Sequence, residues 1–179
     1  MYALSELKET FFKFQQEGYA SDAVKNKTAK IAHRITIIGL EGYKGIEWEE
    51  GPWRVVDCWT VEQNTQTDMV KSAGFTTIWH KKIPIFVMHY GGAYVKSVVP
   101  FLKKALLVNY ETSYFEGGRG PSSFQEGSLL YLNDTTCKEF PNVSNPSFKG
   151  EEKILEFGLE DQVSHGVLRG WHRYFGILL

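Results

Sequence analysis

The sequence predicts an α+β domain in which a helix followed by a three-strand meander occurs twice. The strands would form a mainly antiparallel sheet with both helices on one face. Aromatic residues make up 15% of the 179 residues, which favours β structure or an aromatic-lined cavity. Apolar side chains recur at spacings of two in some segments and of three and four in others. An aromatic, polar, Glu, Gly motif occurs at 48–51 and at 124–127, which indicates an internal repeat.

Composition places the chain among globular proteins, and we expect one domain over 1–179 with repeat halves of about 5–92 and 97–176. It is 42% hydrophobic and 23% charged, with a net charge of −1. This balance leaves no surplus of Lys and Arg for binding nucleic acid. The first residues lack the features of a secretory signal, and no apolar run reaches the ~18 residues of a membrane helix. We therefore expect a cytoplasmic protein in which Cys58 and Cys137 are reduced thiols.

The pattern of apolar residues and turn residues predicts the elements of each half. The expected helices and strands of the first half are 5–17, 33–40, 53–60, 75–80 and 83–90, with Gly91 and Gly92 ending the last strand. Those of the second half are a helix at 97–109 and strands at 127–133, 151–157 and 166–176. Residues 22–34 are polar and basic, and we predict that they form the most mobile internal segment because they bury little apolar surface.

Several short motifs in this order resemble the bacterial family known as domain of unknown function 5680. The motifs are Glu50-Gly51, Asp57 at the centre of a strand, Phe75 at a strand start, Pro84-x-Phe86, and Tyr90-Gly91. The resemblance covers about 5–176, best over 48–110, and Arg173-Tyr174-Phe175-Gly176 is the one clear ending of a second copy. It implies a two-copy fold in a bacterial or phage-like cytoplasmic setting. It implies no catalytic residues.

A polar residue among aromatic residues marks a possible binding site. Asp57 shares a strand face with Trp53 and Trp59, and a buried polar group is costly unless it is hydrogen-bonded. Asp57 either lies at the floor of a ligand cavity or accepts hydrogen bonds from the backbone of a neighbouring loop. We hypothesise a shared groove with Asp57 and His89 as polar contacts. The aromatic residues proposed to line it are Trp53, Trp59, Trp79, Tyr90, Trp171 and Tyr174. The competing interpretation is that these rings fill the core.

Other candidate chemistry is weaker. Glu50 and Glu126 are either a symmetric acid–base pair or solvated residues of two turns. Gly117-Gly118-Arg119-Gly120 follows a helix and is typical of a flexible connector rather than of a phosphate loop. The histidines make no metal-binding spacing with other ligands, although His165 and His172 would converge if a hairpin formed between them. We predict neither a metal nor a cofactor.

These observations favour a non-enzymatic module that binds a small apolar or aromatic ligand or a protein partner, with regulation as one possible role. The first alternative is a small-molecule enzyme that uses Asp57, Glu50 or His89 as acid or base. The second is a protein–protein interaction factor that acts through exposed strand edges or a basic loop. The basic residues of that loop are Lys25, Lys27, Lys30, His33 and Arg34. The oligomeric state is left open by the sequence.

Overall fold

The structure is a computed structural model that describes residues 2–63, 66–158 and 166–179. Its helices are α1 (Leu4–Glu17), the short 3-10 helix η1 (Lys96–Val98) and α2 (Val99–Thr112). Its strands are β1 (His33–Ile35), β2 (Lys44–Glu50), β3 (Trp53–Val61), β4 (Met69–His80), β5 (Ile83–Val95), β6 (Ser123–Glu126), β7 (Leu129–Thr135), β8 (Ser147–Glu156) and β9 (Val167–Leu178).

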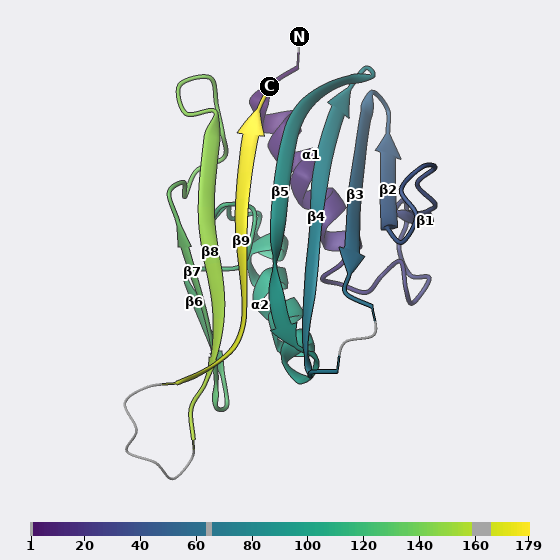
Figure 1. The fold of residues 1–179 in the computed structure, drawn as a ribbon. Helices are drawn as coiled ribbons and strands as arrows, with labels where there is room; N and C mark the ends of the chain where they lie inside the picture. The colour runs from purple at the N-terminus through teal and green to yellow at the C-terminus, as the bar shows by residue number, and fades with distance from the viewer. Residues whose placement is uncertain (1, 64–65, 159–165) are drawn as a thin grey trace.

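The strands of the described residues form one antiparallel sheet in the order β1-β2-β3-β4-β5-β9-β8-β7-β6. The chain runs from one edge to the centre as β1 to β5, passes through α2, and returns from the other edge as β6 to β9 (Figure 1). Strands β5 and β9 pair along the middle, where Tyr90 lies directly opposite Tyr174. The predicted α+β class with a mainly antiparallel sheet is therefore confirmed.

Each half contributes more strands than the predicted three-strand meander. Strands β2 and β6 each form a hairpin with the strand that follows, through turns in which Gly51 and Gly127 both have a φ of +59°. Strand β2 alternates, with Ile46 and Trp48 buried in the core. The glycines at 39, 42 and 45 obscured this alternation in the sequence, and β6 is too short to carry a clear pattern of its own.

Gly91 and Gly92 do not end β5, which continues to Val95. A Cβ on Gly92 would lie 2.0 Å from the backbone oxygen of Trp171 on β9. A glycine inside a strand often marks a close approach of another backbone rather than a chain reversal, and this is the case here. The central pair of strands is therefore long and continuous.

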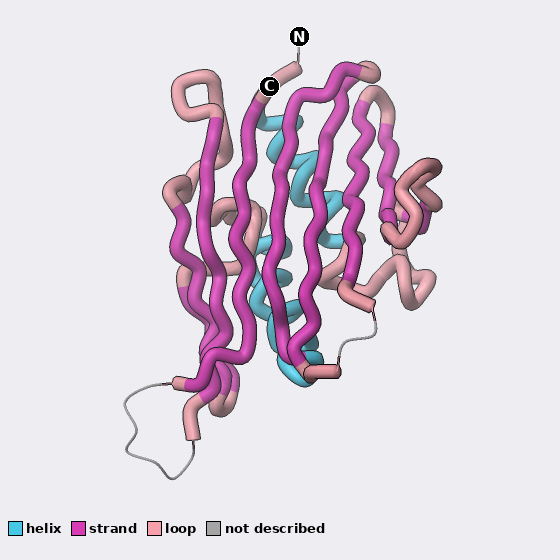
Figure 2. Tube along the Cα trace, viewed as in Figure 1, coloured by secondary structure: helices cyan, strands magenta, loops and turns pink. Residues whose placement is uncertain are grey.

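Both helices lie behind the sheet in the view of Figures 1 and 2, and no helix of the described chain lies in front of it. Helix α1 buries Leu7, Phe11 and Phe14, and α2 buries Leu102 and Leu106, because these side chains recur at helical spacing on one stripe. Their packing against the sheet forms the hydrophobic core. No helix in the described chain is long and apolar enough to cross a membrane.

The loop at 22–34 is held at both ends: Asp22 pairs with Lys103 at its start, and Glu17 contacts its last residues. The carboxylate of Glu17 accepts hydrogen bonds from the backbone N–H groups of Ile31 and Ala32 at 2.9 and 2.8 Å. We predict faster amide exchange over 25–28, because these residues are exposed, and slower exchange at Ile31 and Ala32. Hydrogen exchange followed by NMR measures this. Uniform strong protection from 22 to 34 would contradict the predicted mobility.

Candidate ligand-binding cavity

A cavity of about 380 Å³ lies between the helix-bearing face of the sheet, the two helices and the loop that follows α1. Small-molecule sites typically have volumes of about 300–1,000 Å³ and combine apolar walls with a few polar groups. The apolar walls include Trp59, Met88, Leu102 and Leu106. Its polar groups include the buried side chains of Asp57, Thr76, Arg119 and His172 and the half-buried Tyr90. The cavity therefore has the size and the composition of a small-molecule site.

Asp57 reaches the cavity because the alternation of β3 places it on the face that meets the helices. Its Oδ1 atom accepts hydrogen bonds from the Thr76 hydroxyl at 2.7 Å and the Tyr90 hydroxyl at 2.9 Å. No hydrogen bond within the described residues reaches Oδ2. Burial raises the pKa of Asp57 from 3.8 to about 6, and the two hydrogen bonds offset part of that shift. Asp57 thus offers one carboxyl oxygen that is free to contact a ligand.

Arg119 and Glu152 form a buried ion pair beside the cavity. The guanidinium donates from Nη2 to Oε1 at 2.5 Å and from Nε to Oε2 at 3.1 Å. The hydroxyls of Tyr94 and Tyr131 also donate to Glu152, at 2.5 and 2.6 Å. Burial alone would raise the pKa of Glu152, but the charge of Arg119 and its hydrogen bonds hold that pKa below its ordinary value. The pair fixes the guanidinium at the wall of the cavity.

His172 lies on β9 at the cavity wall and has one free ring nitrogen. Its Nε2 lies 3.1 Å from the Ser72 hydroxyl, whereas its buried Nδ1 has no hydrogen-bond partner. The nearest acceptor is Glu152 Oε1, 3.7 Å from Nδ1, which is too far for a good hydrogen bond. Burial lowers the pKa of His172 to about 4, so the ring is neutral at pH 7. A buried nitrogen without a partner costs about 1–3 kcal/mol. Because Nδ1 is closed off from the cavity, it is not a contact for a ligand.

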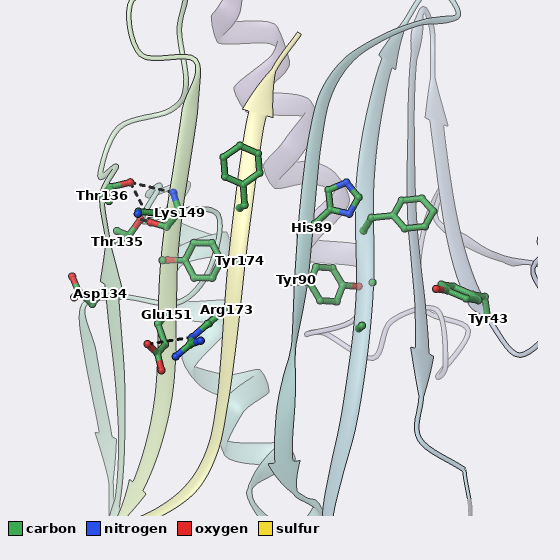
Figure 3. Close-up of a pocket in the computed structure, with 15 residues that line it drawn as sticks. Tyr43, His89, Tyr90, Asp134, Thr135, Thr136, Lys149, Glu151, Arg173 and Tyr174 are labelled. Atoms are coloured by element: carbon green, nitrogen blue, oxygen red, sulfur yellow. Dashed lines mark hydrogen bonds and ion pairs between the residues drawn. The ribbon is translucent and has the colours of Figure 1, made fainter.

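A second, wider depression of about 960 Å³ lies on the open face of the sheet, on the side of His89 (Figure 3). Phe75 and Phe175 also line it. Its charged groups are exposed, as in the pair of Arg173 with Glu151 at 3.7 Å. This depression is larger but shallow and open, so it would leave much of a ligand's surface in solvent. Small-molecule sites usually bury most of the ligand surface. The cavity between sheet and helices is therefore the better candidate.

Two tyrosines connect the central strands with their neighbours. Tyr90 lies across Gly74 on β4, and Tyr174 lies across Gly150 on β8, so the two rings point away from each other in Figure 3. A Cβ on either glycine would lie within 2.6 Å of the tyrosine oxygen. The glycines are therefore required by these ring positions. Because Tyr90 donates to Asp57, its position also orients the carboxylate in the cavity.

The structure separates the residues that the sequence assigned to one groove. Asp57, Trp59 and Tyr90 line the cavity, whereas His89 and Tyr174 line the depression on the open face, which Tyr90 also reaches. The other three indole rings of the set line neither space. They are Trp53, which packs against Tyr2 and His80, Trp79, which lies under the guanidinium of Arg54, and Trp171, which lies under that of Arg173. Neither of these two spaces is lined by all eight residues.

The two Glu-Gly motifs lie far apart. Glu50 accepts from Lys13 at 3.2 Å, and Glu126 accepts from Lys104 at 2.6 Å, both on the protein surface. Strands β2 and β6 are separated by six other strands of the sheet, so the two carboxylates cannot act together. His165, which was predicted to converge with His172, lies outside the described residues. Within the described chain, no group of three or more His, Cys, Asp or Glu side chains is placed to hold a metal ion.

Sequence reasoning did not consider Glu152, and it assigned neither Arg119 nor His172 to the ligand-binding groove. The glycine-rich segment around Arg119 is not a flexible connector: residues 115–120 are all buried, and the amide of Asn109 donates to the Arg119 carbonyl oxygen at 3.1 Å. An arginine between glycines at the end of a helix was the available signal. For Glu152 the signal was its alternation with Ile154, which places a carboxylate on the buried face of β8.

No protein-family model matches this chain, and a search of the curated proteins finds no relative of it. The function is therefore argued from the geometry of the cavity.

Proposed function

We propose that this protein is a small-molecule binding module whose site is the cavity between the sheet and the two helices. One observation carries the proposal. Inside a space of about 380 Å³, the cavity presents a carboxylate oxygen, Asp57 Oδ2, that has no hydrogen-bond partner among the described residues. A packed core fills such a space with side chains and pairs its polar atoms. A bound ligand would do both.

The polar groups in this cavity are also held in place. Asp57 is fixed by two hydroxyl donors, and Arg119 by its bidentate pairing with Glu152. Groups whose own positions are fixed by neighbours lose little entropy when a ligand binds, which favours affinity. This arrangement supports recognition of a ligand rather than a merely structural role for the polar cluster.

We further propose that the two halves arose by internal duplication and that the chain belongs to the family of domain of unknown function 5680, in a bacterial cytoplasm. The turns at Gly51 and Gly127 share their φ, and Asp57 and Asn133 follow them at the same distance. Each of the two accepts a hydrogen bond from a central tyrosine, Asp57 from Tyr90 and Asn133 from Tyr174. The test is to superpose residues 5–92 on residues 97–176. If equivalent strands did not follow one another in the same order in the two halves, the duplication would be contradicted.

A second candidate is an acid–base enzyme that uses Asp57. The specific observation in its favour is the pKa of about 6, because a general base is most effective when its pKa lies near the working pH. The other acid–base residues named from sequence are less suited. Glu50 is paired with Lys13 on the surface, and His89 lies on the open face. Turnover of a cavity ligand that disappears in Asp57→Asn, with binding retained, would favour the enzyme.

Native mass spectrometry tests the proposed site with anilinonaphthalene sulfonate as the probe. We expect one probe molecule per chain. Ala20 lines the cavity and is buried, so Ala20→Leu places three more heavy atoms in the space. If the added atoms displace about five ligand atoms, each contributing ~0.3 kcal/mol of binding free energy, the affinity for the probe falls by about tenfold.

The matched control is Ala105→Leu, at a buried position of α2 that does not line the cavity. There the larger side chain overpacks the core and lowers the free energy of unfolding by about 1–3 kcal/mol. We expect Ala105→Leu to lower stability while the folded protein binds the probe as the wild type does. Equal affinity of Ala20→Leu and the wild type would show that the cavity is not the site.

A further inference from the structure

We propose that the ligand of this cavity is an anion with an apolar body, whose acidic group lies at the mouth of the cavity between Lys25, Arg34 and Lys44. This inference rests on the proposed function and specifies its ligand class. The observation behind it is a local excess of positive charge. The chain as a whole has a net charge of −1, yet the cavity is lined by five cationic side chains and two acidic ones.

The five cations divide into two groups. Two are already neutralised by partners: Arg119 by Glu152, and Lys103 by Asp22. The other three, Lys25, Arg34 and Lys44, have no ion-pair partner within the described residues and are exposed. Elsewhere on the surface, many lysines and arginines do pair with nearby acids, as Arg54 does with Glu47 at 2.5 Å. Three cations without ion-pair partners thus lie together at the rim of this cavity, while others, such as Lys81 and Lys138, lie elsewhere on the described surface.

These three residues come from three elements that meet at the same opening. Lys25 and Arg34 belong to the loop after α1 and to β1, and Lys44 begins β2. Charges of one sign around a low-dielectric cavity reinforce one another and attract an oppositely charged ligand. The basic loop predicted from the sequence is therefore divided by the fold. Lys25 and Arg34 line the cavity, Lys27 and Lys30 do not, and His33 lies 3.5 Å from Glu47.

The inner part of the cavity indicates the rest of the ligand. Trp59, Leu102 and Leu106 form apolar walls between the mouth and the polar floor. An apolar or aromatic body packs there, while the acidic group stays near the rim, where water still reaches it. Placing a charge at the rim avoids the large cost of burying it. At the floor, Asp57 Oδ2 is available to a hydroxyl or amine of the ligand.

A pair of matched fluorescent probes tests the charge preference. Anilinonaphthalene sulfonate carries one negative charge, and phenylnaphthylamine has the same ring system without the sulfonate. We expect the wild type to bind the anionic probe more tightly and its preference to weaken as salt is added. In Lys25→Gln/Arg34→Gln, loss of about 0.5 kcal/mol per charge weakens anionic binding by about fivefold, with little change for the neutral probe.

The control is Lys27→Gln/Lys30→Gln, which removes the same charge from the same loop at positions that do not line the cavity. We expect this variant to keep the preference of the wild type. Equal loss in both double variants would overturn the inference, because it would reflect net charge alone. Binding of both probes with equal affinity, still weakened by Ala20→Leu, would overturn the anionic ligand class and leave the proposed function intact. Binding of neither probe would overturn both.

Discussion

We expect Glu152→Gln to lower the free energy of unfolding by about 3–5 kcal/mol, because it leaves the guanidinium of Arg119 buried without a counter-charge. The side chain of Glu152 is fully buried and that of Arg119 is 9% exposed, so solvent compensates little of the loss. In a chain of this size such a loss corresponds to a fall in Tm of roughly 10 °C. Urea unfolding followed by circular dichroism measures the change.

The neighbouring residue on β8 supplies the control. Glu151 points to the open face and pairs with Arg173 at 3.7 Å, where the arginine side chain is 73% exposed. Exposed ion pairs contribute about 0–1 kcal/mol, so Glu151→Gln should leave stability nearly unchanged. In Arg119→Met/Glu152→Gln the unpaired charge is absent, and we expect much of the stability to return. Similar small effects of Glu151→Gln and Glu152→Gln would contradict the account of the buried pair.

We also expect Asp57→Asn to change how stability depends on pH. The pKa of Asp57 in the folded protein is about 6, above its ordinary 3.8, so between these pH values the folded state binds the proton more tightly than the unfolded state. Asp57 therefore destabilises the fold above pH 6, by about 3 kcal/mol, and this penalty disappears as the pH falls towards 4. Asparagine carries no charge and has no such penalty.

The measurement compares urea unfolding of Asp57→Asn and wild type at pH 4, 5, 6 and 7. We expect the variant to be more stable relative to wild type at pH 7 and the difference to shrink towards pH 4. His172 acts in the opposite sense, since its pKa is lowered to about 4 and the unfolded state binds the extra proton below pH 6.5. It is present in both proteins, so its effect cancels in the comparison. A stability difference that is constant from pH 4 to 7 would contradict the raised pKa.

Local patterns in the sequence were sufficient for the fold class and for Asp57. The helices at α1 and α2 follow from apolar spacing, and the alternation of β3 places an acid among aromatic residues. Strand β2 was missed because glycines precede it, and the continuation of β5 was missed because Gly92 marks contact with β9. In both cases the misleading signal was a glycine: Gly39 and Gly42 take a positive φ before β2, whereas Gly92 makes room for the backbone of β9.

The candidate site depends on strand register, which the sequence alone does not give. Arg54 pairs with Trp79, and Asp57 pairs with Thr76, so Trp79 falls on the face opposite Asp57. A shift of one residue would exchange these faces. The site also depends on the order of strands, because His172 reaches the cavity only where β9 inserts beside β5. Neither fact is encoded in local composition, and the aromatic residues were therefore assigned to one groove instead of two faces.

The most direct test of the central claim is a crystal structure of the protein grown with anilinonaphthalene sulfonate. The account predicts one probe molecule between the sheet and helices α1 and α2, with its rings against Trp59 and Leu106 and its sulfonate at the rim near Arg34. A probe found only on the open face beside His89 and Phe175, with side chains filling the space around Asp57 and His172, would contradict it.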